Sequence, residues 1–248
     1  MEPVLRVQNL AKTFSRGGQT GLSAVNGISF DLMPGECLGI IGESGSGKTT
    51  AANLIARLLD ATAGKIFLDG EDITNLSITD RARRGVSFAF QQPVRFKGLT
   101  VKDLISLAAG EKITVAQACN YLSEVGLCAK NYIDRELDAS LSGGELKRIE
   151  IAMINARGTK LSLFDEPEAG IDLWSFNNLI SVFRSMYERT RGTILIISHQ
   201  ERILDIADKV VVIVNGGIAA YGPKEDILPE LLGTTAGCRL TVKEGATV

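Results

Sequence analysis

Apolar runs of strand length alternate along this chain with stretches of helical periodicity. Helices are predicted at 48–59, 101–109, 115–125, 141–157 and 173–190. Strand-like runs bounded by turn residues occur at 3–10, 28–32, 37–41, 65–70, 86–93, 161–166, 193–199 and 209–217. Nearly continuous apolar strands that alternate with helices indicate an α/β protein, with a parallel sheet covered on both faces.

The middle third of the chain departs from this alternation. Residues 93–157 are predominantly helical and are predicted to form a helical insertion. We expect one domain over 1–235, with its core at about 1–92 and 158–235, and a tail at 236–248 to which no function is assigned.

Composition narrows the classes of partner. The 248 residues are 45% hydrophobic and 23% charged, and the formal net charge is −2. A chain without a net basic field is not expected to bind nucleic acid. It shows no leader and no apolar run of about 18 residues, so we expect a soluble, cytoplasmic protein.

Cysteine and histidine are too sparse for a dedicated zinc site. The cysteines Cys37, Cys119, Cys128 and Cys238 form no CxxC pair, and His199 is the only histidine. Buried or idle thiols in a reducing compartment are the simplest interpretation. A cysteine at a protein interface or at a metal cluster is the alternative.

The stretch "GESGSGKTT" carries the clearest chemistry. Gly42, Gly47, Lys48 and Thr49 match the P-loop pattern, between a predicted strand and a predicted helix. Backbone N–H groups would surround the β-phosphate, Lys48 would reach the β and γ oxygens, and Thr49 would bind Mg²⁺. The predicted nucleotide-binding residues are Gly42, Glu43, Ser44, Gly45, Ser46, Gly47, Lys48, Thr49 and Thr50.

A carboxylate pair ends the apolar run "LSLFDE". Asp165 would hold Mg²⁺ through water, and Glu166 would polarise the attacking water. Taken alone, such a pair is equally well explained as a helix cap or a solvated turn. Together with the P-loop it predicts a site of nucleotide hydrolysis.

Two further polar residues end predicted strands. Gln91 in "FAFQQP" could reach the Mg²⁺ shell, although a polar loop residue is the simpler interpretation. His199 in "TILIISHQ" could be an ordinary structural histidine, but the carboxyl edge of an open α/β sheet is where ligands bind.

The stretch "LSGGELKR" has the features of a second anion site. Its glycine pair, Gly143 and Gly144, opens a predicted helix, where bare N–H groups and the helix dipole favour a phosphate. A domain that binds one nucleotide does not need two such cradles.

The order of P-loop, "FQQP", "LSGGE", "LFDEPEAGID" and "IISH" resembles that of ATP-binding cassette (ABC) ATPases over about residues 4–230. The resemblance implies a P-loop NTPase fold: a RecA-like core, an N-terminal antiparallel β subdomain and a helical insertion. It also implies ATP hydrolysis with ATP and Mg²⁺.

The resemblance assigns a role to each matching residue. Glu166 would be the catalytic carboxylate, Gln91 the coupling glutamine, and His199 the group that contacts the γ-phosphate. Phe14 would stack on adenine, with an ordinary core position as the alternative. Asp172 would lie in the loop that crosses to the partner subunit.

The resemblance also explains the second anion site. In this family two subunits pack head to tail, and each signature closes on the ATP held by the other subunit. Here the signature residues would be Leu141, Ser142, Gly143, Gly144 and Glu145. The implied partner is a second copy or a homologous ATPase, and a lone subunit should hydrolyse ATP poorly.

From this resemblance we expect a soluble iron–sulfur cluster assembly scaffold as the further partner, with the membrane permease of an importer as the alternative. The C-terminal half, including "NYIDRELDASLSGGELKRIEI", is similar to SUF-type (SufC-like) iron–sulfur cluster assembly ATPases, which implies a soluble SufB/SufD-like scaffold. Glu145 and Glu150 favour this interpretation. The N-terminal half resembles ATPases of peptide or metal importers, which implies a membrane permease. A regulatory cassette without turnover is disfavoured by Glu166.

Overall fold

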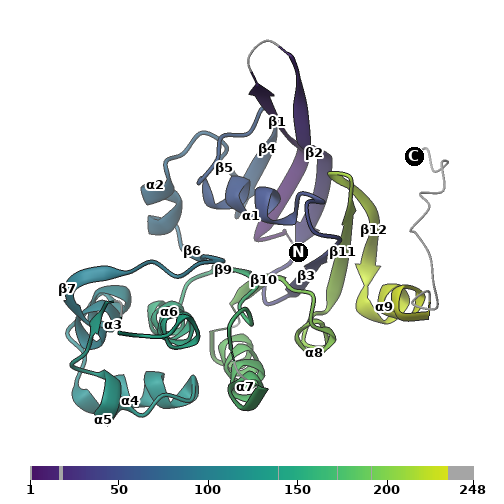
Figure 1. Ribbon diagram of the computed structural model, residues 1–248. Helices are drawn as coiled ribbons and strands as arrows, with labels where there is room; N and C mark the ends of the chain where they lie inside the picture. Colours follow the sequence, from purple (N-terminus) through teal and green to yellow (C-terminus); the bar gives the residue numbers. More distant parts are fainter. Residues whose placement is uncertain (1, 17–18, 139, 172, 191, 234–248) are drawn as a thin grey trace.

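The described residues form a six-stranded sheet, a four-stranded sheet and a helical region that includes a two-stranded sheet (Figure 1). The computed structural model describes residues 2–16, 19–138, 140–171, 173–190 and 192–233. The four-stranded sheet lies at the top of the view, the six-stranded central sheet crosses the middle, and the helical region lies at the lower left. None of the helices within the described residues has the length and apolarity to span a membrane.

The central sheet has the strand order β12-β11-β3-β10-β9-β6. Its strands are β3 (Cys37–Ile41), β6 (Val86–Ala89), β9 (Leu161–Asp165), β10 (Thr193–Ile197), β11 (Lys209–Val214) and β12 (Gly217–Pro223). The pairs β11–β3, β3–β10, β10–β9 and β9–β6 are all parallel. The α/β expectation is confirmed, and the carboxyl ends of these five strands lie along one edge.

The edge strand β12 is antiparallel to β11 and was not predicted from the sequence. Asn215 and Gly216, between the two strands, have φ angles of 49° and 80°. Consecutive left-handed residues are typical of the tight turns whose twist matches that of a hairpin. The Asn-Gly pair is thus the local signal that identifies this strand.

A second, antiparallel sheet has the order β2-β1-β4-β5 and lies above the central sheet (Figure 1). Its strands are β1 (Leu5–Arg16), β2 (Gln19–Leu32), β4 (Ala63–Leu68) and β5 (Glu71–Asp72). Helix α1 (Lys48–Ala56) contributes Leu54 and Ile55 to the hydrophobic core that both sheets share. The helix ends earlier than predicted because Arg57 is left-handed, with φ of 65°.

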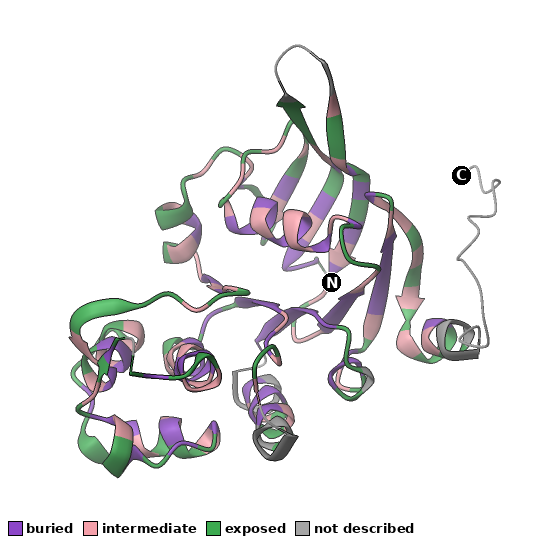
Figure 2. Cartoon of the chain, viewed as in Figure 1, coloured by how far each residue is buried: buried purple, intermediate pink, exposed green. Residues whose placement is uncertain are grey.

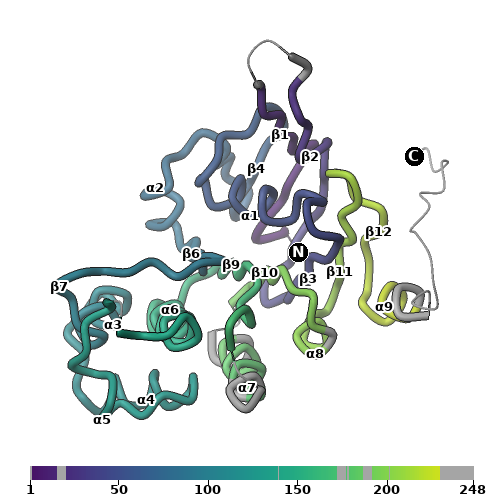
Figure 3. The backbone as a smooth tube through the Cα atoms, in the orientation of Figure 1, coloured from purple at the N-terminus to yellow at the C-terminus, as the bar shows by residue number. Residues whose placement is uncertain are grey.

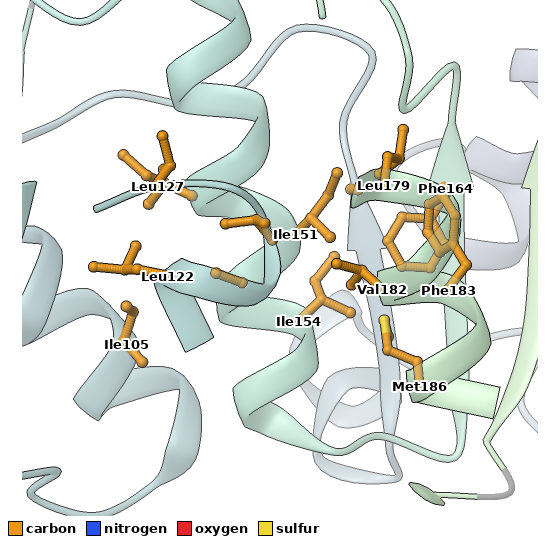
Figure 4. Close-up of a cluster of buried hydrophobic side chains, with 14 of the residues drawn as sticks. Ile105, Leu122, Leu127, Ile151, Ile154, Phe164, Leu179, Val182, Phe183 and Met186 are labelled. Carbon is orange, nitrogen blue, oxygen red and sulfur yellow. The ribbon is translucent and has the colours of Figure 1, made fainter. Parts of the chain in front are cut away.

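Helices cover the other face of the central sheet. Phe164 of β9 packs edge-on against Phe183 of α7 (Leu173–Thr190), with ring centroids 4.8 Å apart (Figure 4). Ile151 and Ile154 of α6 (Gly143–Arg157) lie beside them. Leu163 belongs to the core on the opposite face. Neighbouring residues of β9 thus face opposite sides, which explains why all five of its positions are buried.

The helical region leaves the central sheet after β6 and returns to it through α6 and β9 (Figure 3). Besides α6 it contains α3 (Val101–Ala109), α4 (Val115–Glu124), α5 (Ala129–Tyr132) and the paired strands β7 (Phe96–Thr100) and β8 (Glu136–Leu137). Capping boxes begin α3, α4 and α6. Helical content at 93–157 agrees with the sequence pattern, while the domain boundaries stay a prediction.

Burial follows the sheets (Figure 2): buried residues concentrate on the central strands, and exposed ones on β7 and the outer helices. The remaining helices are α2 (Ile78–Arg83), α8 (Glu201–Leu204) and α9 (Lys224–Gly233). Helix α2 was missed by periodicity because it has only six residues. Its start is marked by the cap of Ser77, whose side chain accepts from the Asp80 N–H.

Helix α2 places one arginine inside the core. Arg81 is 1% exposed and donates to the carbonyls of Leu54 and Ile55 at the end of α1, and to the carbonyl of Thr74. Burial lowers the pKa of Arg81 to about 10. The guanidinium adds donors at the carboxyl end of α1, where the Leu54 carbonyl also accepts from the Arg57 N–H, and it offsets the negative end of the helix dipole.

Replacing the Arg81 side chain should lower the free energy of unfolding more than a substitution at an exposed position does. We expect Arg81→Ala to lower the free energy of unfolding by about 3 kcal/mol, because it removes charged hydrogen bonds to three carbonyls and the donor to the buried Ile55 carbonyl. Urea denaturation measures the loss. The matched control is Arg83→Ala on the same helix, whose side chain is 78% exposed and which should cost under about 0.5 kcal/mol. Equal losses would contradict this role for Arg81.

Candidate functional site

Four segments with predicted chemistry meet at the carboxyl edge of the central sheet. The P-loop follows β3, Gln91 follows β6 after one residue, Glu166 follows β9, and His199 lies two residues beyond β10. Because these strands are neighbours and parallel, residues far apart in sequence are brought to one edge. The sequence pattern predicted this convergence.

The P-loop backbone requires glycine at two of the motif positions. A Cβ at Gly42 would lie 2.2 Å from the Ile213 carbonyl oxygen, and one at Gly47 would lie 2.2 Å from the Ala24 carbonyl oxygen. Gly47 also has φ of 105°, which is unfavourable for L side chains. These glycines therefore permit a close approach between the loop and its two neighbouring strands.

Lys48 is folded over its own loop. Its Nζ donates to the carbonyl oxygens of Gly42 at 2.8 Å and Glu43 at 2.7 Å, and the residue is only 5% exposed. Burial lowers its pKa, while the nearby carboxylates of Glu166 and Asp165 oppose that shift. The ammonium group is thus held at the loop by neutral acceptors, which a phosphate oxygen can replace. Ser46, also buried, has a hydroxyl without a partner among the described residues.

Thr49 and Asp165 meet where Mg²⁺ is expected. The Thr49 hydroxyl donates to Asp165 Oδ1 at 3.2 Å. Asp165 is 1% exposed, and its Oδ2 has no hydrogen-bond partner among the described residues. Burial, with a smaller contribution from the charge of Glu166, raises the pKa of Asp165. An orphaned buried carboxylate oxygen beside a hydroxyl fits the oxygen ligands that Mg²⁺ prefers.

The rest of such a magnesium shell is not supplied by acidic side chains. Within the part of the chain that the structure describes, no three His, Cys, Asp or Glu residues form a metal-holding group. Gln91, the third expected ligand, is bonded instead to Glu166. Water and phosphate oxygens would have to complete the coordination, as is usual for Mg²⁺ at nucleotide sites.

Glu166 receives two side chains from neighbouring strands. Gln91 Nε2 donates to Glu166 Oε2 at 3.1 Å, and His199 Nε2 lies 3.3 Å from Glu166 Oε1. Glu166 has φ of 46°, a strained value for a residue with a side chain. Its N–H donates to the Ile197 carbonyl at 2.9 Å, which ties this conformation to β10. The carboxylate remains 25% exposed and is therefore accessible to water.

Glu168 is a site residue that sequence reasoning missed. Its Oε1 accepts from the Ser198 hydroxyl at 2.5 Å and lies 3.4 Å from the His199 backbone nitrogen, which also donates to it. The loop after β9 is thereby linked to the loop that carries His199. The available signal was the third acidic residue of "DEPE", whose partner 30 residues away has no local signature.

Phe14 lies outside the core. It is 40% exposed on β1, and Lys12 Nζ is 5.2 Å from the centroid of its ring. The alternative of an ordinary core position is therefore wrong. An exposed ring suits stacking on a nucleobase, and that role stays a prediction.

The signature begins α6 with a closed capping box. Ser142 Oγ accepts from the Glu145 N–H, and Glu145 Oε2 accepts from the Ser142 N–H at 2.7 Å. Glu145 Oε1 also accepts from the Tyr132 hydroxyl. Among the described residues, no hydrogen bond joins 141–145 to the P-loop. Gly143 has open space where a Cβ would be.

The second signature glycine lies against the loop after β9. A Cβ at Gly144 would approach the Gly170 carbonyl oxygen to 2.5 Å, so this position has no room for a side chain. Asp172, the residue expected to cross to a partner subunit, lies outside the described residues.

The three cysteines that the structure describes lie outside this site. Cys37 is buried, Cys119 half-buried and Cys128 exposed, all as free thiols, and Cys238 lies outside the described residues. Burial raises the pKa of Cys37, so its thiol stays protonated. This agrees with the interpretation of idle thiols.

A P-loop, a buried aspartate and a following glutamate at one edge of a parallel sheet define a P-loop nucleotide-hydrolysing protein. The family model described as "ABC transporter" matches residues 25–169. The chain belongs to the ABC transporter family of ATP-binding proteins, and it is an ATPase.

Curated relatives carry transporter names. ABC transporter ATP-binding protein MJ0035 of Methanocaldococcus jannaschii is 37% identical over 81% of this chain and 84% of its own length. The sulfate/thiosulfate import ATP-binding protein CysA of Mesorhizobium japonicum is 34% identical over 90% of this chain. The match spans 64% of CysA, so that protein is longer than the shared region.

Solved structures confirm the fold. The dimeric structure of MJ0796, a bacterial ABC transporter cassette, superposes with a TM-score of 0.80 at 22% identity. The match covers 88% of this chain and 98% of that one. The expected P-loop NTPase fold of the ABC type is therefore confirmed.

Loss of the Lys48 ammonium should weaken nucleotide binding. We expect Lys48→Ala to raise the dissociation constant for ATP about 10- to 100-fold, because a charged hydrogen bond to phosphate is lost. Titration with a fluorescent ATP analogue measures it. Lys65→Ala is the control, since Lys65 is 61% exposed and paired with Asp72. Unchanged affinity in the Lys48 variant would contradict its assignment as the phosphate-binding lysine.

Proposed function

We propose that the chain is the ATP-hydrolysing subunit of an ABC transporter, which dimerises on ATP binding and drives a membrane permease. The observation that carries the proposal is the Glu166 carboxylate, contacted by Gln91 and His199 beside a P-loop. The similarity to transporter ATP-binding proteins supports a transporter over other ABC machines. Gln91 follows the strand that enters the helical region, so it lies where movement of that region reaches the site.

In this proposal each residue at the sheet edge acts on one part of ATP. Lys48 binds the β- and γ-phosphates, and Phe14 stacks on adenine. Thr49 and Asp165 would hold Mg²⁺, with Gln91 reaching its shell once ATP is bound; when bound, the ion neutralises charge on the phosphates. Water attacks the γ-phosphoryl group, its proton passes to Glu166, and ADP leaves.

The signature completes the site of a second subunit. Residues 141–145 are not bonded to the P-loop of their own chain, and Gly143 leaves the start of α6 accessible. In a head-to-tail dimer, Ser142 and the glycine N–H groups would donate to the γ-phosphate held by the partner. A lone subunit lacks these donors and should turn over slowly.

Removing the charge of Glu166 should trap this dimer. For Glu166→Gln we expect ATP to be bound and turnover to fall about 100-fold or more, because the proton acceptor is lost. Size-exclusion chromatography with light scattering should show an ATP-dependent dimer. Glu71→Gln, far along the chain on β5 and paired with Arg84, is the control and should behave as the parent protein. Unchanged turnover in Glu166→Gln would overturn the base assignment.

A soluble iron–sulfur scaffold is the second candidate partner. The similarity of "NYIDRELDASLSGGELKRIEI" to SUF-type ATPases favours it. The two acidic residues that pointed the same way are engaged internally, Glu145 with Tyr132 and Glu150 with the Phe90 N–H. Their presence is thus explained without a scaffold, and the transporter remains the better-supported proposal.

Affinity capture from cells distinguishes the two partners. We expect the tagged Glu166→Gln chain, loaded with ATP in mild detergent, to retain a multi-span membrane protein identified by mass spectrometry. The Lys48→Ala chain, which should not close its dimer, is the matched control. Recovery of a detergent-independent complex that acquires iron–sulfur absorbance would instead establish the scaffold as partner.

A further inference from the structure

The signature helix carries a buried ion pair outside the nucleotide site. On α6, Lys147 Nζ lies 3.7 Å from Glu150 Oε2, and the two side chains are 1% and 14% exposed. Burial lowers the pKa of Lys147 and raises that of Glu150. Burying two charges costs several kcal/mol per ion unless additional hydrogen bonds compensate. The hydrogen bonds that Lys147 and Glu150 make to other residues should therefore show what the pair does in the structure.

Both charges hold the backbone of Phe90. The Phe90 N–H donates to Glu150 Oε1 at 3.0 Å, and Lys147 Nζ donates to the Phe90 carbonyl oxygen. Lys147 Nζ also lies 3.4 Å from the carbonyl oxygen of Asp165, in a longer hydrogen bond. One turn of α6 is thus hydrogen-bonded to the backbone just after β6 and to the last residue of β9.

Phe90 and Asp165, the two residues bonded to Lys147 and Glu150, immediately precede the two residues proposed to act in hydrolysis. Phe90 is followed by Gln91, and Asp165 by Glu166. Those two side chains are in turn joined by the 3.1 Å hydrogen bond from Gln91 Nε2 to Glu166 Oε2. A shift of α6 must either move these backbone positions with it or break charged hydrogen bonds worth about 1.5–3 kcal/mol each.

We propose that Lys147 and Glu150 are positioning residues: they couple the signature helix to Gln91 and Glu166, so that engagement of the signature by a partner's ATP sets the geometry of hydrolysis in its own chain. The inference rests on the proposed roles of Gln91 and Glu166. The N-terminus of α6 lies only one turn before Lys147, and a helix transmits such a displacement as a rigid element. The pair would thereby link the two ATP sites of a dimer.

The test separates coupling from stability. In Lys147→Met/Glu150→Leu the charges are replaced by apolar groups of similar volume. Replacing an ion pair in this way is often neutral for folding, but here the Phe90 N–H and carbonyl also lose their partners, so the free energy of unfolding is measured alongside kcat. We expect ATP affinity within about 2-fold of the parent and kcat lowered about 10-fold, because the P-loop is untouched while Gln91 and Glu166 lose their anchor. Hydrogen exchange in a peptide spanning residues 88–92 should accelerate, since the Phe90 N–H loses its acceptor.

Asn155→Leu is the matched control on the same helix. Asn155 is 8% exposed and bonded to Glu124, and its loss should lower stability without changing kcat or exchange at 88–92. Adding Gln91→Ala to the Lys147/Glu150 variant should cost less than the product of the separate losses, because both changes act through one group. Glu150→Ala, which also removes the acceptor, gives the same exchange readout if the double variant does not fold.

Failure of the coupling proposal and failure of the proposed function give different results. If Gln91→Ala alone leaves kcat unchanged, the proposed function loses its coupling glutamine. If Gln91→Ala lowers kcat while the Lys147/Glu150 variant retains the parent's kcat, or if the two losses multiply, the coupling proposal is overturned. Unchanged exchange at residues 88–92 in both acceptor-loss variants would overturn it independently of turnover.

Discussion

The buried carboxylate of Asp165 is the constraint around which the site is arranged. It ends the central strand β9 at 1% exposure, where an isolated charge would be strongly disfavoured. Thr49 donates to it, while the charges of Lys147 and Lys48 oppose the rise that burial causes in its pKa. Its Oδ2 nonetheless has no hydrogen-bond partner within the described part of the chain. The described side chains thus compensate this charge only in part, and a bound cation would supply the remaining compensation.

The unfavourable backbone conformation and the buried charges of the site are confined to a few residues, and the surrounding core holds them in place. Glu166 has a left-handed backbone, and the buried Asp165, Lys147 and Glu150 all carry shifted pKa values. Groups of this kind persist only where the surrounding structure over-determines them. Here the surroundings are fully buried parallel strands, with α1 on one face and α6 and α7 on the other. The sheet is rigid enough to hold a site that would not be stable in a loop.

Periodicity and motif spacing predicted the parallel strands, the P-loop and the edge where Asp165, Glu166 and His199 meet, because each depends on local sequence and on the geometry of parallel sheets. The features that could not be predicted were tertiary contacts between residues far apart in the sequence. The contact of Glu150 with the Phe90 N–H joins residues 60 positions apart, and that of Glu168 with Ser198 joins residues 30 apart. Nothing in a local window reports such a pairing. Helix α2 escaped for another reason, because its six residues are too few for a helical period, and β12 escaped because it is an edge strand that is buried at none of its positions.

The internal contacts also change what the signature says about a partner. Glu145 closes the cap of α6 and accepts from Tyr132, and Glu150 holds Phe90, so both acidic residues satisfy groups of their own chain. A residue already engaged in this way carries little information about an external surface. Choice of partner must therefore be encoded where the helical region is exposed, for example at Val94 and Phe96, which are 43% and 38% exposed. These two residues lie just after Gln91 and line one cavity with Phe90 and Glu150, so a partner seated there would act on the same backbone that Lys147 and Glu150 hold.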